Sequence, residues 1–103
     1  MRLAEYQERA MDTAEYDNVE VVWAQLPEEV GEVFSLKKRL LRGDITIEVY
    51  KRHLHRELGD VLWTISVLAS DMGMSLQEIA VGNLKKLKSR QARGVLMGEG
   101  DDR

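Results

Sequence analysis

Apolar residues recur at intervals of three and four along most of the chain, and this spacing constrains the fold more than any other feature. It is clearest in a segment that begins near Asp44 or Thr46, both suitable helix caps, and runs to about Met72. No stretch alternates with period two, since Ile45-Thr46-Ile47 is too short to count. The pattern predicts an all-α protein, an antiparallel four-helix bundle that is completed by oligomerisation.

The chain has a single proline, which lies in the second predicted helix. Proline lacks an amide hydrogen and clashes with the preceding turn, so it disfavours a helix interior. We therefore predict a helix body from Glu28 to Leu41 with Pro27 in its first turn. Residues 19–26 are then expected to form a separate short turn of helix.

Capping residues and glycines suggest the remaining boundaries. The first helix is expected over about residues 2–16. The fourth opens with Ser75-Leu76-Gln77-Glu78, a capping box in which the Ser75 hydroxyl and the Glu78 carboxylate each satisfy a free backbone N–H. Residues 94–103 are rich in glycine and acidic residues, which is typical of a disordered segment. The chain is thus divided into one helical domain, residues 1–93, and a flexible tail, residues 94–103.

Composition excludes several classes of function. There is no cysteine, which rules out disulfides, thiolate metal sites and a cysteine nucleophile. The net charge of −3 does not favour nucleic-acid binding, which usually needs a basic face. The sequence turns polar directly after Met1, unlike a signal peptide, and no apolar run approaches the roughly 20 residues that span a bilayer. We expect a soluble, cytoplasmic protein that binds neither nucleic acid nor membranes.

Acidic residues fall at helical spacing on two different predicted helices. Glu29 and Glu32 share a face beside Glu28, and Glu57 and Asp60 repeat the three-residue spacing. Apolar residues flank both pairs, where like charges repel by about 0.2–0.5 kcal/mol per pair and burial costs more. A divalent cation relieves both costs, and oxygen ligands suit Mg²⁺ or Mn²⁺.

The alternative interpretation is a solvated helix face, which is the usual environment of an acidic pair. Two glycines favour the metal site, because Gly31 and Gly59 each lie between the acids of a pair. A glycine inside a helix costs about 1 kcal/mol relative to alanine, so its presence needs a reason. We expect the two helices to approach closely at these glycines and to bring four carboxylates around one or two ions.

The acidic motifs and a later helical stripe resemble those of a known family. Glu28-Glu29-Val30-Gly31-Glu32 is similar to the EExxE motif of the MazG-like, all-α nucleotide pyrophosphohydrolases, and Glu57-Leu58-Gly59-Asp60 is similar to their ExxD motif. The resemblance covers essentially the whole chain from about Leu3. One departure is Gln25-Leu26-Pro27, where relatives usually carry a turn of small residues.

This resemblance implies a metal site and a reaction. Glu29, Glu32, Glu57 and Asp60 are expected to coordinate Mg²⁺, with Glu28 in a supporting catalytic role. The expected reaction is hydrolysis of a (deoxy)nucleoside triphosphate between its α- and β-phosphates, which gives a monophosphate and pyrophosphate. Relatives form dimers or dimers of dimers. The apolar stripes of so short a chain also favour a homo-oligomer.

Basic residues supply the candidate phosphate ligands. The resemblance implies that a stripe on the fourth helix binds phosphates, although a solvated basic face near a helix C-terminus is the alternative. Lys38 is a weaker candidate, and Arg103 is one through a GxGDxR-like ending. His53 and His55 are interpreted as ordinary surface histidines. The full set of expected substrate ligands is Asn83, Lys86, Arg90, Lys38 and Arg103.

Three other functions stay open on the sequence. One is a phosphoribosyl-ATP pyrophosphohydrolase-like enzyme, which cleaves another pyrophosphate bond. Another is a non-catalytic helical module that binds nucleotides or a partner helix. The third is a structural dimer with a vestigial site, against which the presence of all four acids argues. The sequence does not determine which base or sugar a substrate carries.

Overall fold

Four helices account for the regular structure of this chain, and the prediction of an all-α fold is confirmed. The structure is a computed structural model that describes all 103 residues and contains no strand. The helices are α1 (Leu3–Asp12), α2 (Val19–Leu41), α3 (Ile47–Asp71) and α4 (Leu76–Ala92). None of them combines the length and the apolar character that are needed to cross a membrane.

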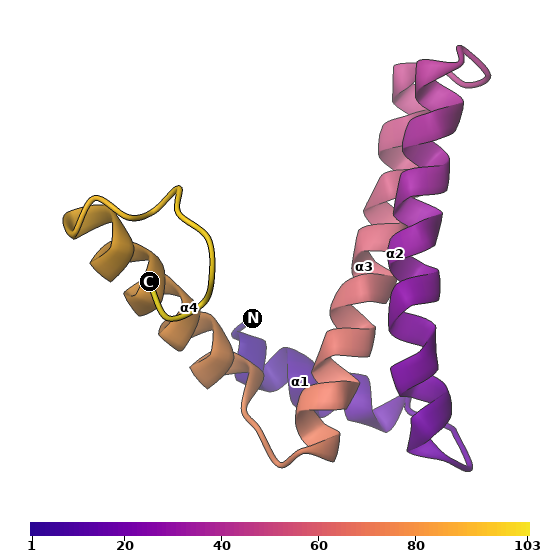
Figure 1. The fold of residues 1–103 in the computed structure, drawn as a ribbon. Coiled ribbons are helices and arrows are strands. Elements are labelled where there is room, and N and C mark those ends of the chain that lie inside the picture. Colours follow the sequence, from indigo (N-terminus) through magenta and orange to yellow (C-terminus); the bar gives the residue numbers. More distant parts are fainter.

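Helices α2 and α3 form a long antiparallel hairpin, which is the largest helix–helix contact of the chain (Figure 1). Buried and half-buried positions alternate between steps of four and three residues along both helices, as in a coiled coil. We call the line of contact formed by these positions the seam. On α2 the seam comprises Val22, Leu26, Glu29, Val33, Leu36 and Leu40, and on α3 it comprises Tyr50, Leu54, Glu57, Val61, Thr64 and Leu68.

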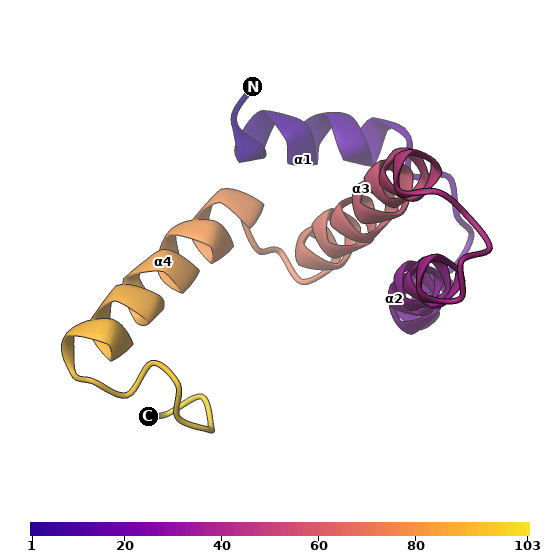
Figure 2. The same ribbon diagram turned by 90° about the horizontal axis from the view of Figure 1, so that it is seen from above.

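Helix α1 packs across the open end of the hairpin, mainly against α3 (Figure 2). Val22, Val67 and Leu68 form the small core beneath it, with Met11 and Trp63 packed alongside. Because two helices and a crossing helix meet only here, the core lies at this end of the hairpin and not along its whole length.

Polar side chains fix the position of α1. The Gln7 amide nitrogen donates to the Ser70 hydroxyl and to the Met74 carbonyl, at 2.9 Å each, and its oxygen accepts from the Leu76 backbone N–H. At the other end of α1, the Trp63 indole donates to the Thr13 hydroxyl at 2.8 Å. These bonds hold α1 against both α3 and the α3–α4 turn.

Side-chain caps define the helix starts. Asn18, Thr46 and Ser75 each accept a backbone N–H at the start of α2, α3 and α4. Thr46, and not Asp44, is therefore the cap of α3, and the Ser75 half of the capping box is confirmed. Helix α1 ends at Asp12, earlier than the expected Tyr16, where the Thr13 hydroxyl donates to the Ala10 carbonyl.

Pro27 lies inside a continuous helix, so the prediction of a separate turn over residues 19–26 is wrong. The helix begins at Val19, eight residues before Pro27, and Asn18 caps it. Val22 and Leu26, which precede Pro27, pack in the seam. An interior proline costs about 3 kcal/mol. Packing of these first two turns offsets that cost, which is a tertiary effect that local propensity does not contain.

Helix α4 extends away from the hairpin and makes no contact with α2 (Figures 1 and 2). The radius of gyration is 16.6 Å, whereas a compact domain of this length has about 13 Å. The four helices therefore do not close into a bundle within one chain, and large apolar residues such as Phe34 and Leu84 stay exposed.

Candidate metal centre

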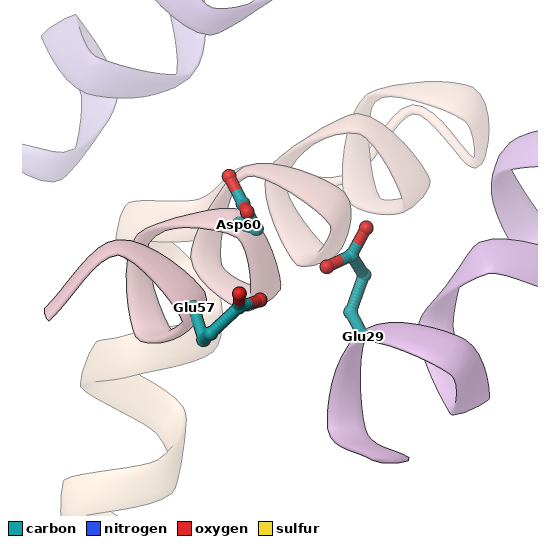
Figure 3. A group of neighbouring side chains, drawn as sticks. All are labelled: Glu29, Glu57 and Asp60. Carbon is teal, nitrogen blue, oxygen red and sulfur yellow. The ribbon is translucent and has the colours of Figure 1, made fainter. Parts of the chain in front are cut away.

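Two glutamates occupy positions in the seam that an ordinary coiled coil fills with apolar residues. Glu29 follows Leu26 and precedes Val33 on α2, and Glu57 lies between Leu54 and Val61 on α3. The two side chains point toward each other across the hairpin, with Asp60 one turn further along α3 (Figure 3). One carboxylate oxygen from each of Glu29, Glu57 and Asp60 lies within 4.8 Å of the other two.

Burial and mutual repulsion disfavour the ionised form of the carboxyl groups in this cluster. Proximity to the Glu32 carboxyl, then burial, then the charges of Glu32, Asp60 and Glu29 raise the pKa of Glu57 to about 6. Burial, followed by the charges of Glu32, Asp60 and Glu28, raises the pKa of Glu29. Negative charge is therefore concentrated where the chain provides nothing to neutralise it.

The cluster also lacks hydrogen-bond donors. One carboxylate oxygen of Glu29 and one of Glu57 are buried and have no hydrogen-bond partner. A buried oxygen without a partner costs about 1–3 kcal/mol, and more when it is charged. No cation of the chain forms an ion pair with any of the acids. A divalent cation would reduce the repulsion between the carboxylates, bind the oxygens that lack partners and take the place of the missing ion pair. The residues therefore fit Mg²⁺ or Mn²⁺, which prefer oxygen ligands.

Glu32 and Glu28 lie at the edge of the cluster. Glu32 is exposed and outside the group of oxygens within 4.8 Å, but its carboxyl raises the pKa of Glu57. Glu28 is exposed, and its charge acts on Glu29. The structure thus brings all five predicted acids to one place, three as a tight group and two beside it.

The two glycines have a different environment from the one expected. A Cβ added at Gly31 or Gly59 would meet nothing within 4 Å, and both residues are exposed. The expectation that α2 and α3 approach closely at these glycines is therefore wrong. Both glycines lie outside the seam, where Glu29 and Glu57 are, so the acids meet through their seam positions and not through glycine contacts.

Sequence reasoning missed Tyr6 of α1. Burial and the charge of Asp60 raise the pKa of the Tyr6 hydroxyl, which shows that α1 brings this phenol into the field of the cluster. Nearby, the Thr64 hydroxyl donates to the Asp60 backbone carbonyl at 2.9 Å. No local pattern in the sequence indicates this role, because the proximity of Tyr6 to Asp60 depends on how α1 crosses α3.

The predicted phosphate ligands lie apart from the acids within one chain. Asn83, Lys86 and Arg90 are on α4, which does not contact α2 and contacts α3 only weakly. Arg103 is in the tail, and Lys38 is exposed near the C-terminal end of α2. Asn83 and Lys86 are exposed, whereas Arg90 is buried.

Comparison with known proteins agrees with the geometry. The family model of the MazG nucleotide pyrophosphohydrolase domain matches residues 18–95, a range that contains all five acids. The chain belongs to this family, whose members generally hydrolyse pyrophosphate bonds of nucleotides and use a divalent metal.

One relative shows the extent of the similarity. The chain is 40% identical over 110 residues to the Gene 37 protein of Mycobacterium phage L5, and the alignment covers 95% of this chain and 96% of that protein. No solved structure matches the chain.

Proposed function

We propose that this protein is a Mg²⁺-dependent nucleoside triphosphate pyrophosphohydrolase, which converts a (d)NTP and water to a (d)NMP and pyrophosphate. The observation that carries the proposal is the group Glu29, Glu57 and Asp60. Each contributes one oxygen to a set within 4.8 Å of one another, without a neutralising partner. Glu32 is the proposed fourth metal ligand. Mn²⁺ is a possible substitute, because it accepts the same oxygen ligands.

The chain's own residues then divide the work. Glu29, Glu32, Glu57 and Asp60 would hold the cation, which supplies Lewis-acid chemistry by polarising phosphoryl oxygens and offsetting their charge. Glu28, which is exposed beside them, would orient an attacking water or take its proton. Lys86, Arg90 and Lys38 would supply positive charge to the pyrophosphate leaving group, and the neutral Asn83 amide would donate a hydrogen bond. Arg103 is instead bonded to carbonyls of its own tail.

The separation of α4 from the acids supports a homo-oligomer. Apolar side chains of α2 and α3 form an exposed face that flanks the acids on the hairpin, which we call the open face: Trp23, Val30, Phe34, Leu58, Leu62, Ile65 and Met72. A second copy packed there would bury this face and could bring its α4 toward the acids of the first. We therefore expect a dimer or a dimer of dimers that acts on soluble nucleotides in the cytoplasm.

The test neutralises one proposed ligand at a time. Glu32→Gln and Asp60→Asn keep the shape of the side chain but remove charge, so Mg²⁺ affinity and turnover should fall. A loss of about 3–5 kcal/mol of transition-state stabilisation corresponds to two to four orders of magnitude in rate. The measurement is pyrophosphate release from a panel of NTPs and dNTPs, with and without Mg²⁺, and it also identifies the preferred base and sugar.

Melting temperatures complete this experiment. Without metal, both variants should be as stable as the parent or more stable, and the increase caused by Mg²⁺ should shrink. Glu8→Gln is the control, because Glu8 is exposed on α1 and forms no ion pair. Variants that hydrolyse nucleotides like the parent would contradict the proposal, and a parent that binds nucleotides without releasing pyrophosphate would indicate a binding module. Preference for phosphoribosyl-ATP would indicate the related hydrolase.

A further inference from the structure

Residues 94–103 fold back on α4 as a closed loop (Figure 1). The Arg103 guanidinium donates to the carbonyls of Val95 at 2.9 Å, Leu96 at 3.1 Å and Gly100. The Arg103 carbonyl accepts from the Arg93 guanidinium at 2.7 Å, which closes the loop. We call these residues the tail loop.

Glycines make this closure possible. A Cβ at Gly98 would lie 2.9 Å from Cδ of Arg103, so the side chain packs directly on the glycine backbone. Gly100 has φ of 83°, in the left-handed region that favours glycine. The glycines therefore allow the loop to close around the Arg103 side chain.

The tail loop places a carboxylate on two of the proposed phosphate ligands. Oδ1 of Asp101 accepts from Lys86 Nζ at 2.9 Å and from Arg90 Nη2 at 2.8 Å. Arg90 Nη2 also donates to the Asp101 backbone carbonyl at 2.6 Å. Hydrogen bonds from Lys86 and then Arg90, together with their charges, hold the pKa of Asp101 at about 2.

The two sides of this contact differ in burial. Arg90 is only 4% exposed, and its Nε is buried without a hydrogen-bond partner, whereas the Asp101 side chain is 80% exposed. A buried guanidinium needs a compensating anion, and Asp101 is the only acid that pairs with it. The anionic side of the contact is therefore open to solvent and exchangeable.

We propose that the Asp101 carboxylate occupies the position of a substrate phosphate group, so that the tail loop is an autoinhibitory plug that a polyphosphate displaces. The inference rests on the proposed function, because it takes Lys86 and Arg90 as phosphate ligands. A phosphate group carries more charge than a carboxylate and has more oxygens for charge-assisted hydrogen bonds, including one to Nε of Arg90. Only molecules with an open plug can bind the polyphosphate, so its apparent affinity falls in proportion to the fraction of molecules that are open.

Binding of inorganic tripolyphosphate, measured by calorimetry without divalent metal on the full chain, tests the plug. Asp101→Asn keeps the shape of the side chain but removes its charge, so this variant should bind about three- to tenfold more tightly than the parent. Asp102→Asn, a change of the exposed neighbouring acid that forms no ion pair, should bind like the parent. Lys86→Gln should bind more weakly. Equal or weaker binding by Asp101→Asn, or unchanged binding by Lys86→Gln, overturns the proposal.

Hydrogen exchange of the tail loop provides a second readout on the unmodified chain. Tripolyphosphate should speed amide exchange over residues 96–103, because displacement breaks the contacts of Asp101 and loosens the loop. Slower exchange there would instead mean that the tail closes over the ligand as a lid, which contradicts the plug.

These two readouts do not depend on hydrolysis. A chain that shows the Asp101→Asn effect but releases no pyrophosphate from nucleotides would remove the proposed reaction and leave the plug. A chain that hydrolyses nucleotides but lacks the effect would remove the plug alone.

Discussion

At the scale of single residues, the main feature is that Glu29 and Glu57 replace apolar side chains in the seam of α2 and α3. Coiled-coil positions of this kind gain stability from apolar packing, which these carboxylates do not provide. Their charges also repel each other, and one oxygen of each carboxylate is buried without a hydrogen-bond partner. Stability is therefore lost locally where the metal site is proposed, a conflict that is expected at functional positions.

The pKa of Glu57 predicts how stability depends on pH without metal. Because the folded state raises this pKa from an ordinary 4.5 to about 6, it binds the proton more tightly than the unfolded chain does. The contribution of Glu57 to stability is then fully present below pH 4.5 and is lost as pH rises through about 6. The glutamine of Glu57→Gln is neutral at every pH, so the stability of this variant relative to the parent should increase between pH 4.5 and 7.

Melting temperatures in a chelator at pH 4.5 and at pH 7 measure this difference. Mg²⁺ at pH 7 should reverse it, because the cation stabilises the ionised parent and not the variant. The exposed control Glu8→Gln should show the same difference from the parent at both pH values. If Glu57→Gln behaves like this control, the carboxyl is an ordinary solvated one.

At the scale of helices, α2 shows how packing overrides local propensity. Pro27 cannot donate a backbone hydrogen bond, yet the helix begins eight residues earlier, at Val19. The Asn18 side chain accepts the Glu20 backbone N–H, and Val22 is almost completely buried against α3 and α1. The first turns are therefore held by tertiary contacts on one side and by a cap at the end.

Replacing this proline should stabilise the chain. Pro27→Ala restores an amide donor and removes the clash, which is partly offset by greater freedom of the unfolded chain, so we expect a gain of about 1–3 kcal/mol. Chemical denaturation measures it. Ser35→Ala, a change at an exposed position of the same helix, controls for helix propensity and should gain about 0.5 kcal/mol or less. A gain no larger than that of the control would show that the proline is already accommodated.

At the scale of the whole molecule, the shape is open. The open face has a cavity of about 250 Å³ near the start of α2 and the end of α3. It is lined only by apolar residues, which include Trp23, Ile65 and Met72. Exposed apolar area on this scale, together with an extended α4, is typical of a chain that buries surface against another copy. Three of the acids, Glu28, Glu32 and Asp60, are exposed in this arrangement.

Self-association should therefore depend on the open face. Light scattering should give a mass of at least twice the 11.8 kDa of the chain at micromolar concentration. Phe34→Glu and Leu62→Glu place a charge on this face and should shift the protein toward monomer. Met97→Glu is the control, because Met97 is 94% exposed on the tail loop. A monomeric parent would contradict the prediction, as would equal dissociation by the control.

Several features were predictable because they are local. Period and composition predicted four helices, Thr46 and Ser75 predicted caps, and the three-residue spacing placed each pair of acids on one face. Helical hydrogen bonds and side-chain periodicity involve residues within one or two turns, so a single sequence contains them. The resemblance to the family rests on the same local motifs and agrees with the family match.

Other features depended on which faces meet. The seam positions of Glu29 and Glu57, the proximity of Tyr6 to Asp60 and the contact of Asp101 with Arg90 all join distant parts of the chain or a folded loop. Spacing alone suggested close approach at Gly31 and Gly59, which the structure does not show. Sequence by itself thus determined the helices and the acids that each presents, because these follow from short-range geometry. Only the tertiary structure decided what those acids face, because burial and charge depend on the packing of whole helices.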